Sequence, residues 1–235
     1  MLKIDNLHTT YGPVEALHGI NMTIEDGAVV GVLGANGAGK TTLLKSIAGL
    51  LRVSQGRTVY AGKDITNQSA QRIVKLGVSL VPQGRLLFTE MSVRENLEMG
   101  AYLLHDRAEF NKRLDDVQGM FPILKERSQQ MVALMSGGEQ QMLAVARALM
   151  TKPDLILLDE PSIGLAPKIF DQILATIKEL NTNHKTTIVI AEQNVKKILK
   201  IVDYAYVLES GKVAIEGTAE QLSNNEAIRQ AYLGL

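Results

Sequence analysis

The sequence predicts an α/β fold built on a largely parallel sheet, and three kinds of segment point to it. Ala28–Leu33 is a continuous apolar run, typical of a strand that is covered on both faces. A glycine-rich turn follows, and Thr41–Ala48 then has the character of a helix, so the chain passes from strand to loop to helix. Strand patterns return at Leu155–Leu158, Thr186–Ile190 and Tyr204–Leu208. Helical stretches separate them, as crossover connections between parallel strands require.

Two shorter patterns predict antiparallel strands in the same core. Apolar and polar residues alternate over Ile20–Ile24, as in a strand with one buried face. Later in the chain, Ser210–Lys212 predicts the turn of a final hairpin. We therefore expect one domain whose α/β core, with an antiparallel β region, is formed by residues 1–91 and 151–235.

Residues 92–150 lack strand patterns and predict a helical subdomain inserted into that core. Ser92 and Glu95 have the spacing of a capping box at a helix N-terminus. Helical periodicity is expected to continue from there through Leu104, and a second helix is expected to stop near Pro122.

Composition and charge exclude several classes of function. Lys plus Arg and Asp plus Glu number 25 each, so no global field favours nucleic acid or anionic lipid. Cysteine is absent, which rules out disulfides and thiolate metal sites and suits a reducing cytosol. The longest stretch without a charged residue, Gly27–Gly39, is too short and too rich in glycine to span a membrane. A role at a membrane would therefore require a membrane-embedded partner.

The glycine-rich turn has the spacing of a phosphate-binding loop. Residues 34–41 fit the pattern G-x-x-x-x-G-K-[ST]. Its glycines let backbone N–H groups point inward around phosphate oxygens, and the following helix adds its positive N-terminal end. Lys40 is expected to reach the β- and γ-phosphates, and Thr41 to ligate Mg²⁺. The pattern lies between a predicted strand and a predicted helix, which distinguishes it from a chance glycine-rich turn.

Two adjacent carboxylates, Asp159 and Glu160, follow the apolar strand at Leu155–Leu158. Buried carboxylates are costly unless a cation or polar partners accompany them, and strand ends border the ligand crevice of open α/β sheets. Asp159 is therefore the candidate for holding Mg²⁺, and Glu160 is the candidate general base for an attacking water. Alone, the pair is more typical of a solvated turn at the end of a strand. Together with the phosphate loop, it indicates nucleotide hydrolysis.

A third motif, Ser136–Gln141, precedes a helical run. A hydroxyl, two glycines and a helix N-terminus form an anion site, although an ordinary N-cap has the same composition. The phosphate loop, Ser136-Gly137-Gly138 and Asp159-Glu160, in this order, resemble the ABC ATPase family, and the resemblance covers the whole chain. It implies a P-loop NTPase fold that binds and hydrolyses ATP with Mg²⁺.

The same resemblance implies roles for further residues. Tyr11 matches the aromatic residue that stacks on adenine, and Gln83 matches the glutamine that senses Mg²⁺ and water and links the ATP site to the helical subdomain. Ser162–Leu165 matches a segment that crosses the dimer interface, and Gln193 stands at the switch position, where most relatives carry histidine. The expected ATP-binding residues are Tyr11, Gly34, Asn36, Gly37, Gly39, Lys40, Thr41, Thr42, Ser136, Gly137 and Gly138. The expected catalytic residues are Glu160, Gln193 and Gln83, and the expected metal-binding residues are Thr41, Gln83 and Asp159.

The resemblance also implies partners. In this family two subunits bind ATP head to tail, with the phosphate loop of one facing the signature motif of the other. We therefore expect an ATP-dependent homodimer, or a heterodimer with a related ATP-binding subunit, held by transmembrane permease subunits at the cytoplasmic face of the cell membrane. A secreted solute-binding protein would be an indirect partner, and nucleic acid is not expected.

Local sequences narrow the resemblance to the second ATP-binding subunit of branched-chain amino-acid importers. They include Glu139–Ala144, Asp159–Pro167, Ala191–Asn194 and the ending Ala231–Gly234. The ATP-binding subunits of related importers of urea and short amides share many of these local sequences, so such an importer is the alternative assignment.

Three other classes of nucleotide-binding protein fit the sequence less well. A P-loop GTPase would need a guanine-reading Asn-Lys-x-Asp segment, which the sequence lacks. ABC ATPases that work on DNA outside transport carry long coiled-coil insertions, for which 235 residues leave no room. A subunit that holds ATP without turnover is disfavoured because the candidate base Glu160 is present.

Overall fold

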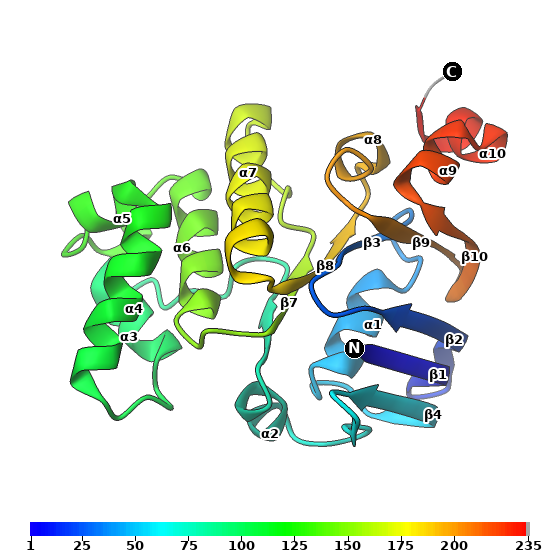
Figure 1. Cartoon of the computed structure of the whole chain (residues 1–235), viewed down its shortest axis with the longest axis horizontal. Helices are drawn as coiled ribbons and strands as arrows, with labels where there is room; N and C mark the ends of the chain where they lie inside the picture. Colours follow the sequence, from blue (N-terminus) through cyan, green and yellow to red (C-terminus); the bar gives the residue numbers. More distant parts are fainter. Residues whose placement is uncertain (234–235) are drawn as a thin grey trace.

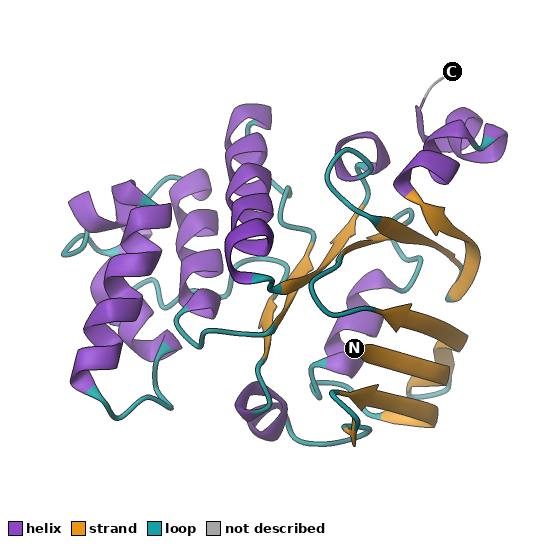
Figure 2. Ribbon diagram, in the orientation of Figure 1, coloured by secondary structure: helices purple, strands orange, loops and turns teal. Residues whose placement is uncertain are grey.

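The computed structural model describes residues 1–233, whose strands form two sheets, as Figures 1 and 2 show. The larger sheet has six strands in the order β10-β9-β3-β8-β7-β6. The strands β9, β3, β8, β7 and β6 are parallel to one another. The remaining strand, β10, pairs antiparallel with β9 and forms the predicted hairpin. The strands are β3 (Val29–Leu33), β6 (Val78–Val81), β7 (Leu155–Asp159), β8 (Thr187–Glu192), β9 (Tyr204–Glu209) and β10 (Lys212–Thr218). The α/β fold class is thereby confirmed.

The parallel strands are apolar throughout because both of their faces are covered. On β7, Ile156 and Leu158 belong to one hydrophobic core, and Leu155 and Leu157 belong to a second. The same alternation on β8 follows from the two-residue period of side chains along a strand. The first core includes residues of the helices α3, α4, α6 and α7, and the second includes residues of α1 and of the smaller sheet. The six-stranded sheet thus lies between two cores.

The smaller sheet is antiparallel, has four strands in the order β2-β1-β4-β5, and gives the antiparallel region that was expected. Along β2, residues Ile20–Ile24 alternate between buried and exposed, as their sequence predicts. The sheet packs its buried face against α1 through apolar residues such as Leu17 and Leu43. Its strands are β1 (Leu2–Tyr11), β2 (Val14–Ile24), β4 (Val53–Tyr60) and β5 (Lys63–Asp64).

Helices occupy most of the block between β6 and β7. Ser92 caps α3 through the predicted capping box with Glu95. This helix ends at Gly100, so the expectation that it continues through Leu104 is wrong. A side chain at position 100 would lie 2.3 Å from the carbonyl oxygen of Arg147, so the glycine allows α3 to lie close against α6. The helices are α3 (Val93–Gly100), α4 (Arg107–Met120), α5 (Pro122–Glu126), the short 3₁₀ helix η1 (Val132–Leu134) and α6 (Gly137–Leu149).

Pro122 begins a helix as well as ending one. It occupies the first turn of α5, where its missing N–H leaves no hydrogen bond unmade. The other helices are α1 (Lys40–Ile47), α2 (Ala70–Lys75), α7 (Pro167–His184), α8 (Val195–Ile198), α9 (Ala219–Asn224), α10 (Glu226–Ile228) and the π-helical turn η2 (Arg229–Leu233). Within residues 1–233, no helix has the length and apolar character needed to cross a membrane. Gly234, part of the sequence ending used for the resemblance, lies outside the described residues.

Candidate functional site

The loop between β3 and α1 is shaped by glycines that no other residue could replace without strain. Gly34, Gly37 and Gly39 have φ values of 151°, 80° and 104°. A Cβ atom at Gly34 would lie 2.4 Å from the carbonyl oxygen of Leu208. The loop therefore passes close to the end of β9 before it enters α1, and its amides precede the N-terminus of that helix.

Lys40 is the only charged residue of the loop, and its side chain is buried. Its Nζ donates hydrogen bonds to the carbonyl oxygens of Gly34 at 2.9 Å and Ala35 at 3.0 Å. It also lies 3.0 Å from Oε1 of Glu160. The ammonium group is thus held inside the curve of the loop, where an anion would bind.

The two carboxylates of the acid pair lie beside the loop at the end of β7. Thr41 Oγ1 donates to Oδ1 of Asp159 at 2.9 Å, and Asp159 is only 1% exposed. Burial raises the pKa of Asp159, which indicates that its negative charge lacks full compensation. Among the described residues, Oδ2 of Asp159 has no hydrogen-bond partner. An orphaned carboxylate oxygen beside a threonine hydroxyl fits the oxygen ligands that Mg²⁺ prefers.

Glu160 turns its side chain back toward the loop because its backbone leaves the strand sharply. Its φ of 47° is in the left-handed region, and its amide donates to the carbonyl oxygen of Ala191 on β8 at 2.9 Å. Its Oε2 accepts a hydrogen bond from Nε2 of Gln83 at 3.2 Å, while Oε1 faces Lys40. The structure therefore brings together five of the predicted residues, which come from the phosphate loop and from the ends of β6 and β7: Lys40, Thr41, Gln83, Asp159 and Glu160.

A cavity of about 400 Å³ opens over these groups. Tyr11 lies at its edge: the hydroxyl is 3.5 Å from Oγ1 of Thr42, and the residue is 47% exposed. The walls come from the loop and α1, from β2, from Glu160 and from the β9–β10 turn. The lining residues are Val14, Glu15, Ala16, His18, Gly37, Gly39, Lys40, Thr41, Thr42, Glu160, Ser210 and Gly211.

Comparison with known proteins agrees with this geometry. The family model described as "ABC transporter" matches residues 17–163. The chain is 43% identical, over the full length of both chains, to the high-affinity branched-chain amino acid transport ATP-binding protein BraG of Pseudomonas aeruginosa. It is 38% identical to the probable branched-chain amino acid transport ATP-binding protein LivF of Archaeoglobus fulgidus, covering 100% of this chain and 99% of the relative. The chain belongs to the ABC transporter family, as an ATP-binding subunit.

Solved structures of ABC transporter cassettes share the fold. An ATP-binding cassette in its ADP conformation superposes with a TM-score of 0.84 at 27% identity, covering 100% of this chain and 99% of that one. A dimeric cassette in a post-hydrolysis state, bound to ADP and Pi, has a TM-score of 0.83 at 26% identity, with coverage of 93% and 99%.

The signature motif of this ABC subunit lies away from its own phosphate loop. None of Ser136, Gly137 and Gly138 is among the residues that line the cavity over the loop. Ser136 caps α6 in a capping box with Glu139, so the residues that resemble the signature motif also form the N-terminus of this helix. Gly138 lets α6 approach α7, because a Cβ there would lie 2.9 Å from Ile169.

Gln193 is exposed at the end of β8. The neighbouring Asn194 caps α8, accepting a hydrogen bond from the amide of Lys197 at 3.1 Å. The structure thus assigns the cap to Asn194 and leaves the Gln193 side chain out of it.

Sequence reasoning missed two residues that connect these motifs. Arg85, two residues beyond Gln83, donates to the side-chain oxygens of Gln140 at 3.2 Å and Gln141 at 3.3 Å in the signature helix. Glu192, which is buried, accepts hydrogen bonds from Ser162 and from the amide of Gln193. Glu192 could have been identified from its position, because it is a carboxylate at the end of an apolar strand, as Asp159 is.

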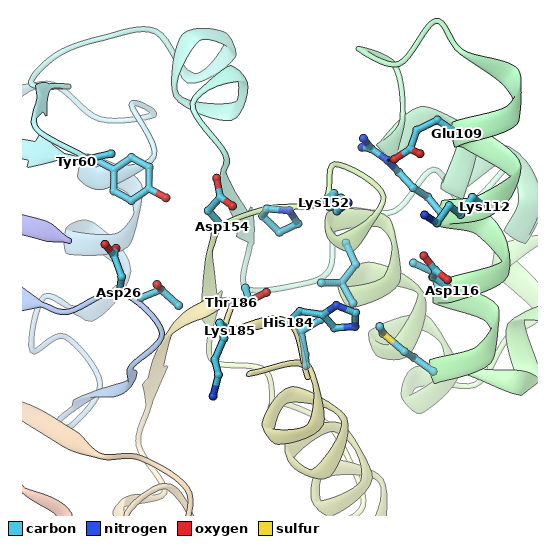
Figure 3. A pocket seen from close by; sticks show the side chains of 18 residues that line it. Asp26, Tyr60, Glu109, Lys112, Asp116, Lys152, Asp154, His184, Lys185 and Thr186 are labelled. Atoms are coloured by element: carbon cyan, nitrogen blue, oxygen red, sulfur yellow. Dashed lines mark hydrogen bonds and ion pairs between the residues drawn. The ribbon is translucent and has the colours of Figure 1, made fainter. Parts of the chain in front are cut away.

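Another cavity, of about 460 Å³, lies on the seam between α4 and the core and is drawn in Figure 3. Asp26 and Tyr60 point into it from the core side, and Lys112 and Asp116 face them from α4. Burial raises the pKa of Tyr60 to about 12, so its phenol is neutral at physiological pH. The loop residues 34–41 and the acid pair do not line this cavity, which is separate from the nucleotide site.

Proposed function

We propose that this subunit hydrolyses ATP to power an importer of branched-chain amino acids. The observation that carries the solute assignment is the 43% identity to a branched-chain amino acid transport ATP-binding protein over the full length of both chains. The buried constellation of Lys40, Thr41, Asp159 and Glu160 supports the hydrolytic part of the proposal.

In the proposed reaction, Lys40 and the loop amides bind the β- and γ-phosphates of ATP. Asp159 and Thr41, with Gln83, would hold Mg²⁺, which when bound neutralises phosphate charge and orients the γ-phosphate. Glu160 accepts a proton from water as the water oxygen bonds to the γ-phosphorus. The bond from that phosphorus to the bridging oxygen breaks, and ADP and phosphate are released.

Other residues of the site are proposed to bind or to sense nucleotide. Tyr11 offers an exposed ring for stacking on adenine at the cavity edge, and Asn36 and Thr42 belong to the loop and to α1. Gln193 would donate an uncharged amide hydrogen bond near the γ-phosphate. Ser136, Gly137 and Gly138, away from their own loop, would bind the ATP of a second subunit, as the dimeric state of a related cassette allows.

Residues 92–150 are proposed to form a helical subdomain that docks transmembrane permease subunits. Phe88, just before this block, is 44% exposed, and Leu86 at 68% and Leu134 at 72% are also exposed. The amide of Ala133 donates to the carbonyl oxygen of Thr89 at 3.1 Å, and this bond holds the segments that carry Phe88 and Leu134 side by side. Exposed apolar patches of this kind mark protein interaction sites. A secreted solute-binding protein would act on the far side of the permeases.

The solute assignment is tested with the assembled transporter. We expect leucine, isoleucine and valine, presented with the solute-binding protein, to stimulate ATP turnover and to accumulate in proteoliposomes. Urea and acetamide serve as the comparison. Stimulation by urea or acetamide, with no response to the three amino acids, would assign the subunit to the related importers instead.

Phe88→Asp is expected to break assembly with the permeases while leaving ATP binding intact. The charge would be placed on the apolar surface but outside both cores, because Phe88 is already exposed. Co-purification with the permeases measures assembly, and titration calorimetry measures ATP binding. Leu50→Asp is the matched control, since Leu50 is 55% exposed in the turn that follows α1. If the Phe88 variant still binds the permeases, or if its circular dichroism spectrum is that of an unfolded protein, this surface is not the docking interface.

A further inference from the structure

Glu192 is a carboxylate without a role in the reaction described above, and it is almost completely buried, at 1% exposure. Its Oε1 accepts the backbone amide of Ser162 at 2.8 Å. Its Oε2 accepts the hydroxyl of Ser162 at 2.9 Å and the backbone amide of Gln193 at 3.1 Å. One carboxylate therefore joins the segment that follows Glu160 to the residue at the switch position.

Within the described residues, the Glu192 carboxylate accepts three hydrogen bonds and donates none, which suits its ionised form. Burial nevertheless raises the pKa of Glu192, and the nearby charge of Glu160 adds to the shift. Burial therefore disfavours the charged form, whereas the three hydrogen bonds favour it.

The position of Glu192 connects it to the proposed catalytic groups. Ser162 is two residues beyond Glu160, and Gln193 directly follows Glu192. The strands that carry these residues, β7 and β8, are parallel neighbours, with Asp159 in register with Ala191. A shift of the Ser162 segment would change the direction of Glu160, whose backbone already bends sharply at φ 47°.

We propose that Glu192 is a positioning residue that latches the Ser162–Leu165 segment to Gln193 and so fixes Glu160 and Gln193 relative to each other during ATP hydrolysis. The proposal rests on the proposed ATPase function. Its partners are a hydroxyl and two backbone amides of this chain, and Glu192 is not among the residues that line the cavity over the phosphate loop. Loss of a supporting hydrogen bond of this kind lowers activity by about 10- to 100-fold.

The test compares Glu192→Gln with wild type in the full-length chain, measuring kcat, the Kd for ATP and the melting temperature. An amide can still accept from the Ser162 amide, but its NH₂ group faces the Gln193 N–H, so the latch opens at Gln193. We expect kcat to fall about 10- to 100-fold with an ATP Kd within about twofold of wild type. The melting temperature should stay within about 4 °C, because the buried charge is removed with the hydrogen bond. Glu179→Gln, the same change at an exposed position of α7, is the matched control.

Two further variants separate positioning from general damage. Ser162→Ala removes one donor to Glu192, and it should lower kcat in wild type but add little in the Glu192→Gln background. Gln193→Ala keeps the backbone amide that Glu192 accepts and removes only the side chain, so a fall in kcat with ATP binding retained would show that this side chain is what the latch positions. A Glu192→Gln protein with wild-type kcat overturns the latch, as does a loss of kcat accompanied by weaker ATP binding or a large fall in melting temperature. If wild type itself does not hydrolyse ATP, the proposed function fails before the latch is tested.

Discussion

Replacing Lys40 with alanine should weaken ATP binding by at least about 10- to 100-fold, because each charge-assisted hydrogen bond contributes about 1.5–3 kcal/mol. Lys40 is the only charged residue of the loop, and its Nζ is held at the curve where phosphates would bind. Titration calorimetry with Mg-ATP measures the loss. Lys75→Ala is the control, since it removes an exposed lysine from α2.

The same substitution also removes one partner of a buried ion pair. Lys40 and Glu160 lie 3.0 Å apart with side chains that are 2% and 9% exposed. A buried charge left without its partner is destabilising, so the melting temperature of the ligand-free variant should fall. A folded variant that binds ATP with near wild-type affinity would show that the loop holds phosphate without this lysine.

Glu160→Gln should bind ATP and hydrolyse it about 10²–10⁴-fold more slowly, because an amide cannot accept the proton of the attacking water. The amide oxygen of the new glutamine can still face Lys40. Glutamate and glutamine bear the same backbone strain at position 160, so the fold is expected to persist. Single-turnover hydrolysis separates the chemical step from product release. Trapped ATP should shift the protein toward a dimer, which sedimentation measures.

Glu25→Gln is the matched control for this variant, since it makes the same change in an exposed turn before β3. Its turnover should equal that of wild type. Wild-type turnover by Glu160→Gln itself would mean that another group activates the water, and Asp159 would be the next residue to examine, because burial already raises its pKa.

The sequence was sufficient to predict the parts of the site that are local in the chain. The phosphate loop is one segment in which spacing and glycine conformation act together, and the structure places its glycines at positive φ. Asp159 and Glu160 could be placed because an apolar strand that ends in two acids must find partners for them. The helix that begins after Ser92 was predictable for the same reason, since a capping box involves four adjacent residues.

The connections between distant segments could not be predicted in this way. The contacts of Arg85 with the signature helix join residues more than 50 positions apart, and no short pattern records them. The end of α3 at Gly100 depends on the close approach of Arg147 from another helix. Glu192 lies within Ala191–Asn194, but two of its three donors belong to Ser162, in a loop whose path depends on the fold.

The six-stranded sheet contributes side chains to both cores, so the register of β7 determines the packing on both sides of the sheet. Each step along this strand changes which half of the protein a side chain supports, from Leu157 in one core to Leu158 in the other. A one-residue insertion would exchange the two sets of side chains and displace Asp159 by about 3.3 Å along the strand. Packing on both faces therefore fixes the position of Asp159 along the strand. It keeps this proposed metal ligand within hydrogen-bonding distance of Thr41, 118 positions earlier in the chain.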